Sequence, residues 1–307
     1  MALKRWFCWP RAIFRTSSQR PRLPWVSFTS QRHRPSQHLF ASGWLRVPSR
    51  VMTGTGVVRQ NVGMDLSTPA QHSEWNWSIC PVVTLTVEGQ RVPGHGVRGT
   101  AFLIDNEDDG LIGMTARHVL DGLQPGQTAA LLLPNGAEFR PLFVSAAEFH
   151  PTEDIAVFTL ANDRPAGRVR LRTSTDRFPI SGDYAVLGYP DDDYWRGDSE
   201  GVTLELTYSA GHLRRYRGPG NLPGIRGNMF MELSQRAGAG CSGAPVLLRP
   251  TLPDSADPTA FPVFGIYVGE RSSRQGDAAP LTFAYAVPFS AVSDWEPQLL
   301  NGRSLFT

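Results

Sequence analysis

The chain has 307 residues, of which 41% are hydrophobic and 10% aromatic, and its formal net charge is +2. This length and apolar content predict a globular protein of one or two domains and exclude a disordered chain. No apolar run approaches the roughly 18 residues of a membrane-spanning helix, and the N-terminus lacks the unbroken apolar segment of a secretory signal. We therefore expect neither a membrane partner nor export.

The first 64 residues form a cationic leader with eleven Lys or Arg and no Asp or Glu. This Arg-rich, Ser-rich composition resembles a mitochondrial or plastid transit peptide. A translation start assigned upstream of the true one, at Met52 or Met64, explains it equally well. The body is expected in the cytoplasm, or in a mitochondrion or plastid if the leader is a transit peptide.

The sequence shows no pattern typical of a metal centre. Its three cysteines, Cys8, Cys80 and Cys241, have no metal-ligand spacing and cannot all pair within one chain, which favours a reducing compartment. The acidic runs at 105–110 and 190–200 contain carboxylates of the kind that ligate calcium, but neither run matches the spacing of an EF-hand loop, which favours solvated hairpin turns. We expect no metal and no cofactor.

From Cys80 onward, short apolar runs alternate with clusters of Gly, Pro, Asn and Asp. Twelve such runs with almost no helical periodicity predict an all-β sandwich or barrel and argue against βαβ units. The predicted strands are 81–89, 100–105, 111–116, 129–134, 139–149, 154–160, 183–190, 202–213, 229–234, 244–248, 262–269 and 282–288. One short C-terminal helix is expected at 289–300.

These patterns also predict the domain organisation. Residues 1–77 are expected to form a leader outside the fold, because their charge and prolines oppose burial. Residues 78–300 are expected to form the one folded domain, and residues 301–307 a tail.

The stretch RAGAGCSGAPVLL, residues 236–248, places Ser242 among small residues just before a predicted strand. The glycines at 238, 240 and 243 permit backbone angles closed to other residues and let a second molecule approach closely. This pattern fits the turn of a nucleophile, and it also fits an ordinary loop that leads into a strand.

A histidine and an aspartate with suitable contexts accompany this serine. A serine nucleophile needs a base to take its proton, and that base needs an acid to hold its tautomer. His118 follows an apolar run in GMTARHVLDG, and Asp154 opens a predicted strand in HPTEDIAVFTL. Their order, with Ser242 last, matches one known arrangement of a catalytic triad. Four other histidines are expected to be ordinary surface or core residues: His72, His95, His150 and His212.

The segments GTAFLI, MTARHVL, EDIAVFTL and GCSGAPV together resemble the signatures of trypsin-like serine peptidases. The resemblance covers roughly residues 79–295 and implies two packed six-stranded β-barrels (a chymotrypsin-like fold) with the site between them. VLGYPDDD, GCSGAPV and FGIYVGE are further similar to the bacterial glutamyl-endopeptidase branch. The resemblance implies that His118 is the general base, Asp154 its orienting acid and Ser242 the nucleophile. It also implies an oxyanion hole made by the backbone N–H groups of Gly240 and Ser242.

The sequence departs from that resemblance around the expected substrate pocket. Cys241 replaces the aspartate that pairs with a new N-terminus in digestive enzymes, so activation by that ion pair is not expected. Tyr267 stands where glutamyl endopeptidases have a histidine, so a preference for glutamate does not follow. Arg236 would favour an acidic substrate side chain and Glu270 a basic one; the alternative is that both face solvent. The pocket residues expected from the resemblance are Arg236, Tyr267, Val268, Gly269 and Glu270.

The sequence therefore predicts a serine endopeptidase that acts on protein or peptide substrates through an acyl-enzyme. The alternative is a catalytically silent relative that serves as a binding module. No nucleic-acid partner is expected, because the arginines of the body are scattered and the prolines of the leader oppose a continuous basic helix. The sequence does not predict an oligomeric state.

Overall fold

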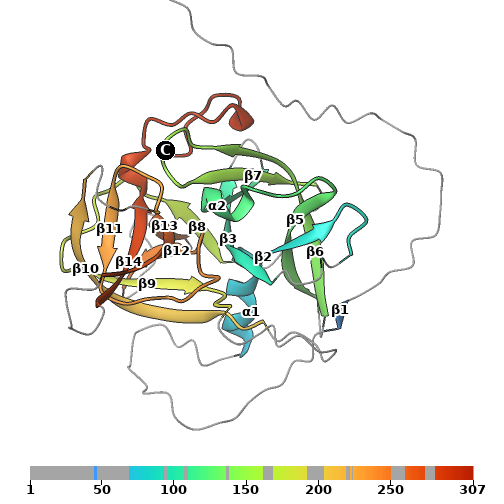
Figure 1. The fold of residues 1–307 in the computed structure, drawn as a ribbon, viewed down its shortest axis with the longest axis horizontal. Coiled ribbons are helices and arrows are strands. Elements are labelled where there is room, and N and C mark those ends of the chain that lie inside the picture. Colours follow the sequence, from blue (N-terminus) through green and yellow to red (C-terminus); the bar gives the residue numbers. More distant parts are fainter. Residues whose placement is uncertain are drawn as a thin grey trace, which may run out of the picture. The chain divides into compact units, whose positions relative to one another are not determined.

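The hydrophobic runs of the sequence form strands in the computed structural model, which pairs them in two antiparallel sheets (Figure 1). The structure describes residues 45–46, 69–90, 92, 96–106, 110–135, 138–161, 169–191, 204–218, 222, 224–249, 260–273 and 281–306. The expectations about the rest of the leader, and about the acidic residues 192–200, lie outside these described residues. Within them, no helix is long and apolar enough to cross a membrane.

The first sheet is a closed barrel of six strands. They pair in the order β6-β5-β2-β3-β4-β7, and a further pairing of β6 with β7 closes the barrel. A two-residue strand, β1 (Leu45–Arg46), adds to the edge of β6. The six strands are β2 (Ile79–Thr86), β3 (Val97–Asn106), β4 (Gly110–Thr115), β5 (Gln127–Asn135), β6 (Glu138–Phe149) and β7 (Ala156–Leu160).

The second sheet forms a barrel in the same way. Its strands pair in the order β12-β9-β10-β11-β14-β13, and β12 pairs with β13 to close it. A short strand, β8 (Arg170–Thr173), runs parallel to β13. The six strands are β9 (Asp183–Gly188), β10 (Thr207–Arg217), β11 (Phe230–Leu233), β12 (Pro245–Leu248), β13 (Ala260–Ser273) and β14 (Leu281–Pro288). All twelve predicted strands are therefore confirmed, six in each barrel.

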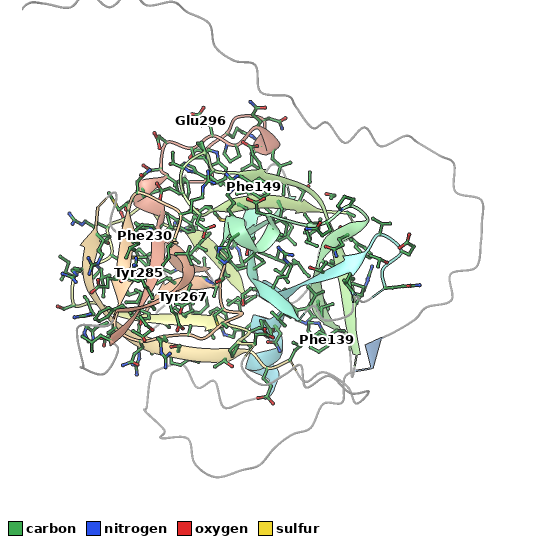
Figure 2. All side chains as sticks on the ribbon, in the orientation of Figure 1. Phe139, Phe149, Phe230, Tyr267, Tyr285 and Glu296 are labelled. Atoms are coloured by element: carbon green, nitrogen blue, oxygen red, sulfur yellow. The ribbon has the colours of Figure 1, made fainter. Side chains whose placement is uncertain are left out.

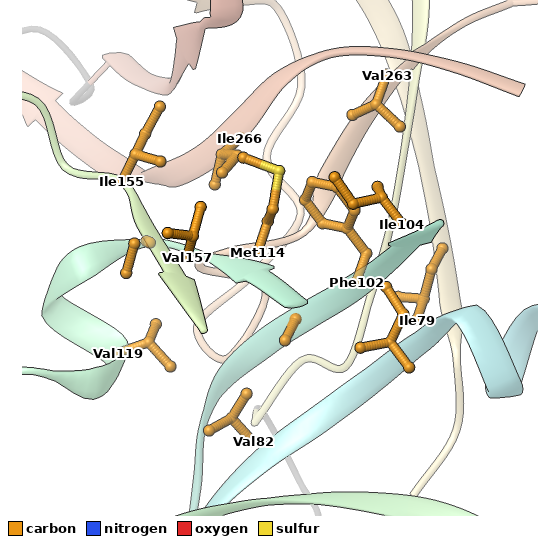
Figure 3. Packing of buried hydrophobic residues seen from close by; sticks show 14 of the residues in the cluster. Ile79, Val82, Phe102, Ile104, Met114, Val119, Ile155, Val157, Val263 and Ile266 are labelled. Atoms are coloured by element: carbon orange, nitrogen blue, oxygen red, sulfur yellow. The ribbon is translucent and has the colours of Figure 1, made fainter. Parts of the chain in front are cut away.

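The two barrels share one hydrophobic core. Phe102 and Met114 of the first barrel and Val263 and Ile266 of the second are fully buried members of a single cluster. Figure 3 shows the side chain of Met114 directed toward Ile266. Because burying a side chain of this size contributes about 1.5–3 kcal/mol, this shared packing fixes the barrels against each other.

A helix precedes the first barrel, which corrects the expected domain boundary. α1 (Pro69–Ser78) lies almost wholly in the segment assigned to the leader, yet Trp75 is buried and its ring lies 5.0 Å from that of Phe261. The hydroxyl of Tyr189 also donates to Asn76 Oδ1 at 3.0 Å. Residues 69–77 therefore belong to the folded domain.

The C-terminal segment departs from its prediction in two ways. Instead of one helix it contains two 3₁₀ turns, η1 (Phe289–Ala291) and η2 (Gln298–Leu300). Pro297 precedes η2, and a proline there removes a backbone donor that a continuous helix would need. The expected tail is also part of the fold, because Leu305 is buried and its carbonyl accepts the Thr173 hydroxyl at 2.8 Å.

Candidate active site

His118 lies on α2 (Arg117–Leu120), a single helical turn that follows β4. Val119 and Leu120 are buried and anchor this turn to the barrel, whereas the His118 side chain is 47% exposed. Arg98 also anchors the turn, since its guanidinium donates to Val119 O at 2.7 Å. The local sequence thus buries its apolar residues and leaves the imidazole at the surface.

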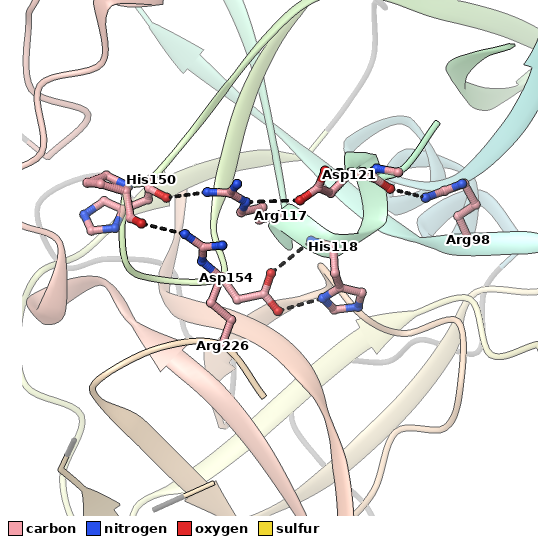
Figure 4. A network of polar contacts seen from close by, with 9 residues as sticks. Arg98, Arg117, His118, Asp121, His150, Asp154 and Arg226 are labelled. Atoms are coloured by element: carbon pink, nitrogen blue, oxygen red, sulfur yellow. Dashed lines mark hydrogen bonds and ion pairs between the residues drawn. The ribbon is translucent and has the colours of Figure 1, made fainter. Parts of the chain in front are cut away.

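Asp154 contacts His118 through both carboxylate oxygens (Figure 4). Its Oδ2 lies 2.6 Å from His118 Nδ1, and its Oδ1 accepts the His118 backbone N–H at 2.9 Å. The Asp154 side chain is only 5% exposed. A buried carboxylate at Nδ1 favours the tautomer with the proton on Nδ1 and leaves Nε2 as the basic nitrogen.

The loop that carries Asp154 is held by groups that the sequence analysis did not assign to the site. His150 Nδ1 accepts the Glu153 N–H at 2.9 Å, and the carboxylate of buried Glu153 accepts the Asn228 N–H at 3.0 and 3.1 Å. Asn228 Nδ2 donates to the same carboxylate at 3.1 Å, and Arg226 donates to Pro151 O at 2.6 Å. The segment 226–228 of the second barrel therefore holds residues 150–154 of the first barrel, the acid loop, in place.

His150 is a buried residue with satisfied contacts, as the sequence predicted. Its ring packs edge-on against Trp295 with centroids 5.0 Å apart. Burial lowers the pKa of His150 below its ordinary value, and the nearby Glu153 and Asp294 oppose that shift. The carbonyl of His150 accepts an Arg117 N–H at 3.2 Å, which connects the acid loop to α2 (Figure 4).

Ser242 lies in a tight turn that requires glycine at defined positions. Gly240 has φ +86°, and a Cβ there would fall 2.5 Å from Tyr189 O and 2.7 Å from Asp191 N. Gly243 has φ +94°, and its backbone N–H donates to Tyr267 O at 2.7 Å. These angles and contacts are closed to other L-residues, which explains the small residues around the serine.

The serine turn belongs to the second barrel and docks on β3 of the first. Ser242 O accepts the Thr100 N–H at 2.7 Å, and Gly240 O accepts the Thr100 hydroxyl at 3.0 Å. A Cβ on Gly99 would lie 2.6 Å from Ser242 O and 2.5 Å from a methyl group of Val119. Ser242 and the helical turn of His118 therefore meet at the same glycine.

The geometry does not complete the expected triad by itself. No hydrogen bond between Ser242 Oγ and His118 occurs among the described residues, so their link remains a prediction. Among the residues that the structure describes, the backbone N–H groups of Gly240 and Ser242 donate no hydrogen bond. They are thus available as donors, as an oxyanion hole requires.

Only three of the five expected pocket residues contact one another. Tyr267, Glu270 and Arg236 form one polar cluster: the Tyr267 hydroxyl donates to Glu270 Oε1 at 2.9 Å, and Glu270 Oε2 lies 3.6 Å from Arg236 Nη1. Val268 instead packs in the shared hydrophobic core. Gly269 has φ +137° and supplies backbone only. No group of three or more potential metal ligands occurs in the described residues.

A comparison with protein families finds one matching model. Residues 99–250 match the family model described as Trypsin-like peptidase domain. This range includes His118, Asp154 and Ser242. No match is found among the curated proteins. The glutamyl-endopeptidase branch is not confirmed.

Several solved peptidases have a similar structure. The protease domain of MamO from Magnetospirillum magneticum, in its apo form, is 10% identical, with 72% of this chain and 95% of that chain covered and a TM-score of 0.46. The inactive form of the Rv3671c protease is 17% identical, with 77% and 97% covered and a TM-score of 0.44. The HtrA-type protease AlgW with a tripeptide is 16% identical, with 73% and 60% covered and a TM-score of 0.45. The fold assignment rests on the strand pairing, and residues 99–250 are similar to the family of trypsin-like peptidase domains.

Proposed function

We propose that the chain is a serine endopeptidase in which Ser242, His118 and Asp154 form the catalytic triad. The observation that carries the proposal is the paired contact of Asp154 with His118, next to a glycine-rich serine turn docked on the same barrel. An ordinary surface loop would need neither the buried carboxylate nor the positive φ angles of Gly240 and Gly243. Both features have a direct use in acyl transfer.

The proposed reaction proceeds through an acyl-enzyme. Ser242 Oγ attacks the substrate carbonyl carbon while His118 Nε2 takes the hydroxyl proton. Asp154 holds the imidazole and stabilises its charged form. The N–H groups of Gly240 and Ser242 donate to the oxyanion, whose charge develops only in the transition state. His118 then gives the proton to the leaving amine, and a water molecule, activated by the same imidazole, releases the acyl group.

Active-site labelling tests the proposal. A fluorophosphonate probe should label the wild-type chain, and Ser242→Ala should abolish both the label and peptide cleavage. Ser145→Ala is a matched control, because Ser145 is an exposed strand residue that pairs with Thr159 Oγ1. Labelling that survives Ser242→Ala would mean that another residue is the nucleophile. A wild-type chain that neither labels nor cleaves would favour a silent binding module.

His118→Ala should reduce cleavage by a factor of about 10⁴ or more, because the serine then has no base. His212→Ala is the control, since His212 is an exposed histidine on β10 of the second barrel. Equal loss in the two variants would contradict the assignment of the base.

A further inference from the structure

Glu232 is a fully buried carboxylate on β11 that the proposed peptidase mechanism does not use. Its neighbours Met231 and Leu233 pack inside the second barrel, so Glu232, which alternates with them, points to the outer face of the sheet. A buried carboxylate is costly unless cations compensate its charge. Three arginines of the adjacent strand β10 do so: Arg214, Arg215 and Arg217.

The backbone of β10 brings two consecutive arginines to the same carboxylate. The pairing of β10 with β11 shifts register between Leu213 and Arg215. Such a bulge breaks the alternation of side chains, so Arg214 and Arg215 both reach Glu232. Arg214 Nη1 and Arg215 Nε lie 3.0 and 3.2 Å from Glu232 Oε1, and Arg217 Nε donates to Oε2. Three guanidinium groups therefore converge on one carboxylate.

This cluster carries an excess of positive charge at the surface. Three positive charges meet one negative charge, and the two in excess repel each other at short range. Among the described residues, Glu232 supplies the only oxygen atoms that the three guanidinium groups contact, so most of their N–H donors have no protein acceptor. The side chains of Arg214, Arg215 and Arg217 are 37%, 54% and 27% exposed, so an anion from solvent can reach these donors.

Aromatic residues of β14 hold the cluster in place. The Arg214 guanidinium lies 4.2 Å from the centre of the Phe283 ring, a cation–π contact that orients its plane. Tyr285 is paired in register with Glu232, and its ring packs against that of Phe230 with centroids 6.3 Å apart (Figure 2). Burial raises the pKa of Tyr285, so its phenol stays neutral and adds no second negative charge to the cluster.

We propose that Arg214, Arg215 and Arg217 bind a phosphate-type oxyanion, with Glu232 as the fixed acceptor that holds the three guanidinium groups together. A dianionic phosphate balances the two excess charges, and its oxygens accept the N–H groups that do not reach Glu232. Arginine suits this ligand because its planar fork of donors matches the geometry of a phosphate. The proposal does not depend on the peptidase function, since no residue of the cluster belongs to the proposed triad or to the serine turn.

Calorimetric titration of the full-length chain tests the proposal with two probes, inorganic phosphate and a phosphoserine peptide, in a chloride buffer of about 0.15 M ionic strength. Phosphate should bind at one site per chain, and Arg215→Gln and Arg217→Gln should each weaken binding about 10- to 100-fold, the usual effect of losing a charged hydrogen bond. Arg172→Gln is the matched control, because Arg172 is an exposed arginine on β8. Tighter binding of the phosphoserine peptide than of phosphate would identify a phosphorylated polypeptide as the ligand, and equal binding would identify free phosphate.

A charge-conserving variant keeps the test valid if a glutamine variant fails to fold. Arg217→Lys retains the positive charge beside Glu232 but lacks the planar fork, so it should also weaken phosphate binding while its melting temperature stays close to that of the wild type. A wild-type chain that binds neither probe would overturn the proposal. Equal weakening by Arg217→Gln and Arg172→Gln would also overturn it, because the attraction would then be non-specific. Fluorophosphonate labelling measures the peptidase function separately.

Discussion

Replacing Glu153 should reduce turnover without weakening substrate binding. Glu153 is buried beside Asp154, and its carboxylate receives both the N–H and the side-chain amide of Asn228 from the other barrel. Hydrogen bonds to a charged group contribute about 1.5–3 kcal/mol each, and removing the buried carboxylate also relieves a desolvation cost. Glu153→Ala should therefore lower the free energy of unfolding by about 2–4 kcal/mol.

The effect on catalysis should follow from the position of Asp154. Without Glu153 the acid loop loses its attachment to Asn228, and a displacement of about 1 Å at a catalytic group can cost up to about 100-fold in rate. We expect kcat to fall about 10- to 100-fold in Glu153→Ala, with KM within about twofold of the wild type. Glu153→Gln keeps one acceptor oxygen and should recover most of kcat.

Denaturant unfolding and steady-state kinetics on one peptide measure both quantities. Glu205→Gln serves as the control, since Glu205 is exposed. If Glu153→Ala kept full kcat despite the expected loss of stability, the carboxylate would be a structural residue only. A rise in KM at constant kcat would mean that Glu153 binds substrate, and the positioning role would be wrong.

Three further predictions concern backbone strain, pH and the N-terminal segment. Gly243→Ala should abolish activity and lower the free energy of unfolding by more than about 3 kcal/mol, because its Cβ would fall 2.0 and 2.1 Å from two oxygen atoms. Gly122→Ala, with φ +75° and nothing within 4 Å, should lower it by only about 1–2 kcal/mol, so similar melting temperatures for the two variants would refute the steric argument. Because the pKa of His150 is lowered in the folded protein, its contribution to stability should be complete above the ordinary pKa of 6.5 and be lost as the pH falls through the folded value. The free energies of unfolding of the wild type and His150→Asn, measured from pH 8 to 5, should therefore converge, and a constant difference between them would contradict this. A chain beginning at Met64 should retain its melting temperature and activity, whereas one that also lacks the helix carrying Trp75 should lose about 3–5 kcal/mol of stability. A large loss in the longer chain would mean that the preceding residues, which include β1 paired with β6, stabilise the first barrel.

The strands could be predicted because each barrel strand buries a short apolar run between turn residues, and this pattern is local. β8 was not predicted because it has no such apolar run: its exposed and buried residues alternate over only four positions, and two of them are Arg170 and Arg172. α1 escaped because the Pro- and Arg-rich composition of the leader hid a helix whose burial depends on Trp75 contacting Phe261, far away in the sequence. Tertiary packing, not local preference, decides both elements.

The site could be predicted only where its chemistry has a sequence context. His118, Asp154 and Ser242 stand at strand ends and among glycines, whereas Glu153 has no such signal. Its role follows from Asn228, 75 residues away, which reaches it only when the two barrels are packed. The partner of Glu270 likewise depends on the bulge in β13, which shifts the side-chain alternation by one residue.

Thr100 explains how the proposed nucleophile and the proposed base, which lie on different barrels, keep a fixed relation. Its N–H donates to Ser242 O and its hydroxyl donates to Gly240 O, while the same hydroxyl accepts the Tyr189 N–H at 2.9 Å. Its carbonyl accepts the Thr115 hydroxyl at 2.6 Å, at the end of the strand that leads to the histidine turn. Because all of its polar groups are engaged, Thr100 cannot move without breaking contacts to both sides. The serine turn is thereby set in register with the strand that leads to His118, and this buried residue holds the carbonyl groups of the two proposed oxyanion donors, Gly240 and Ser242.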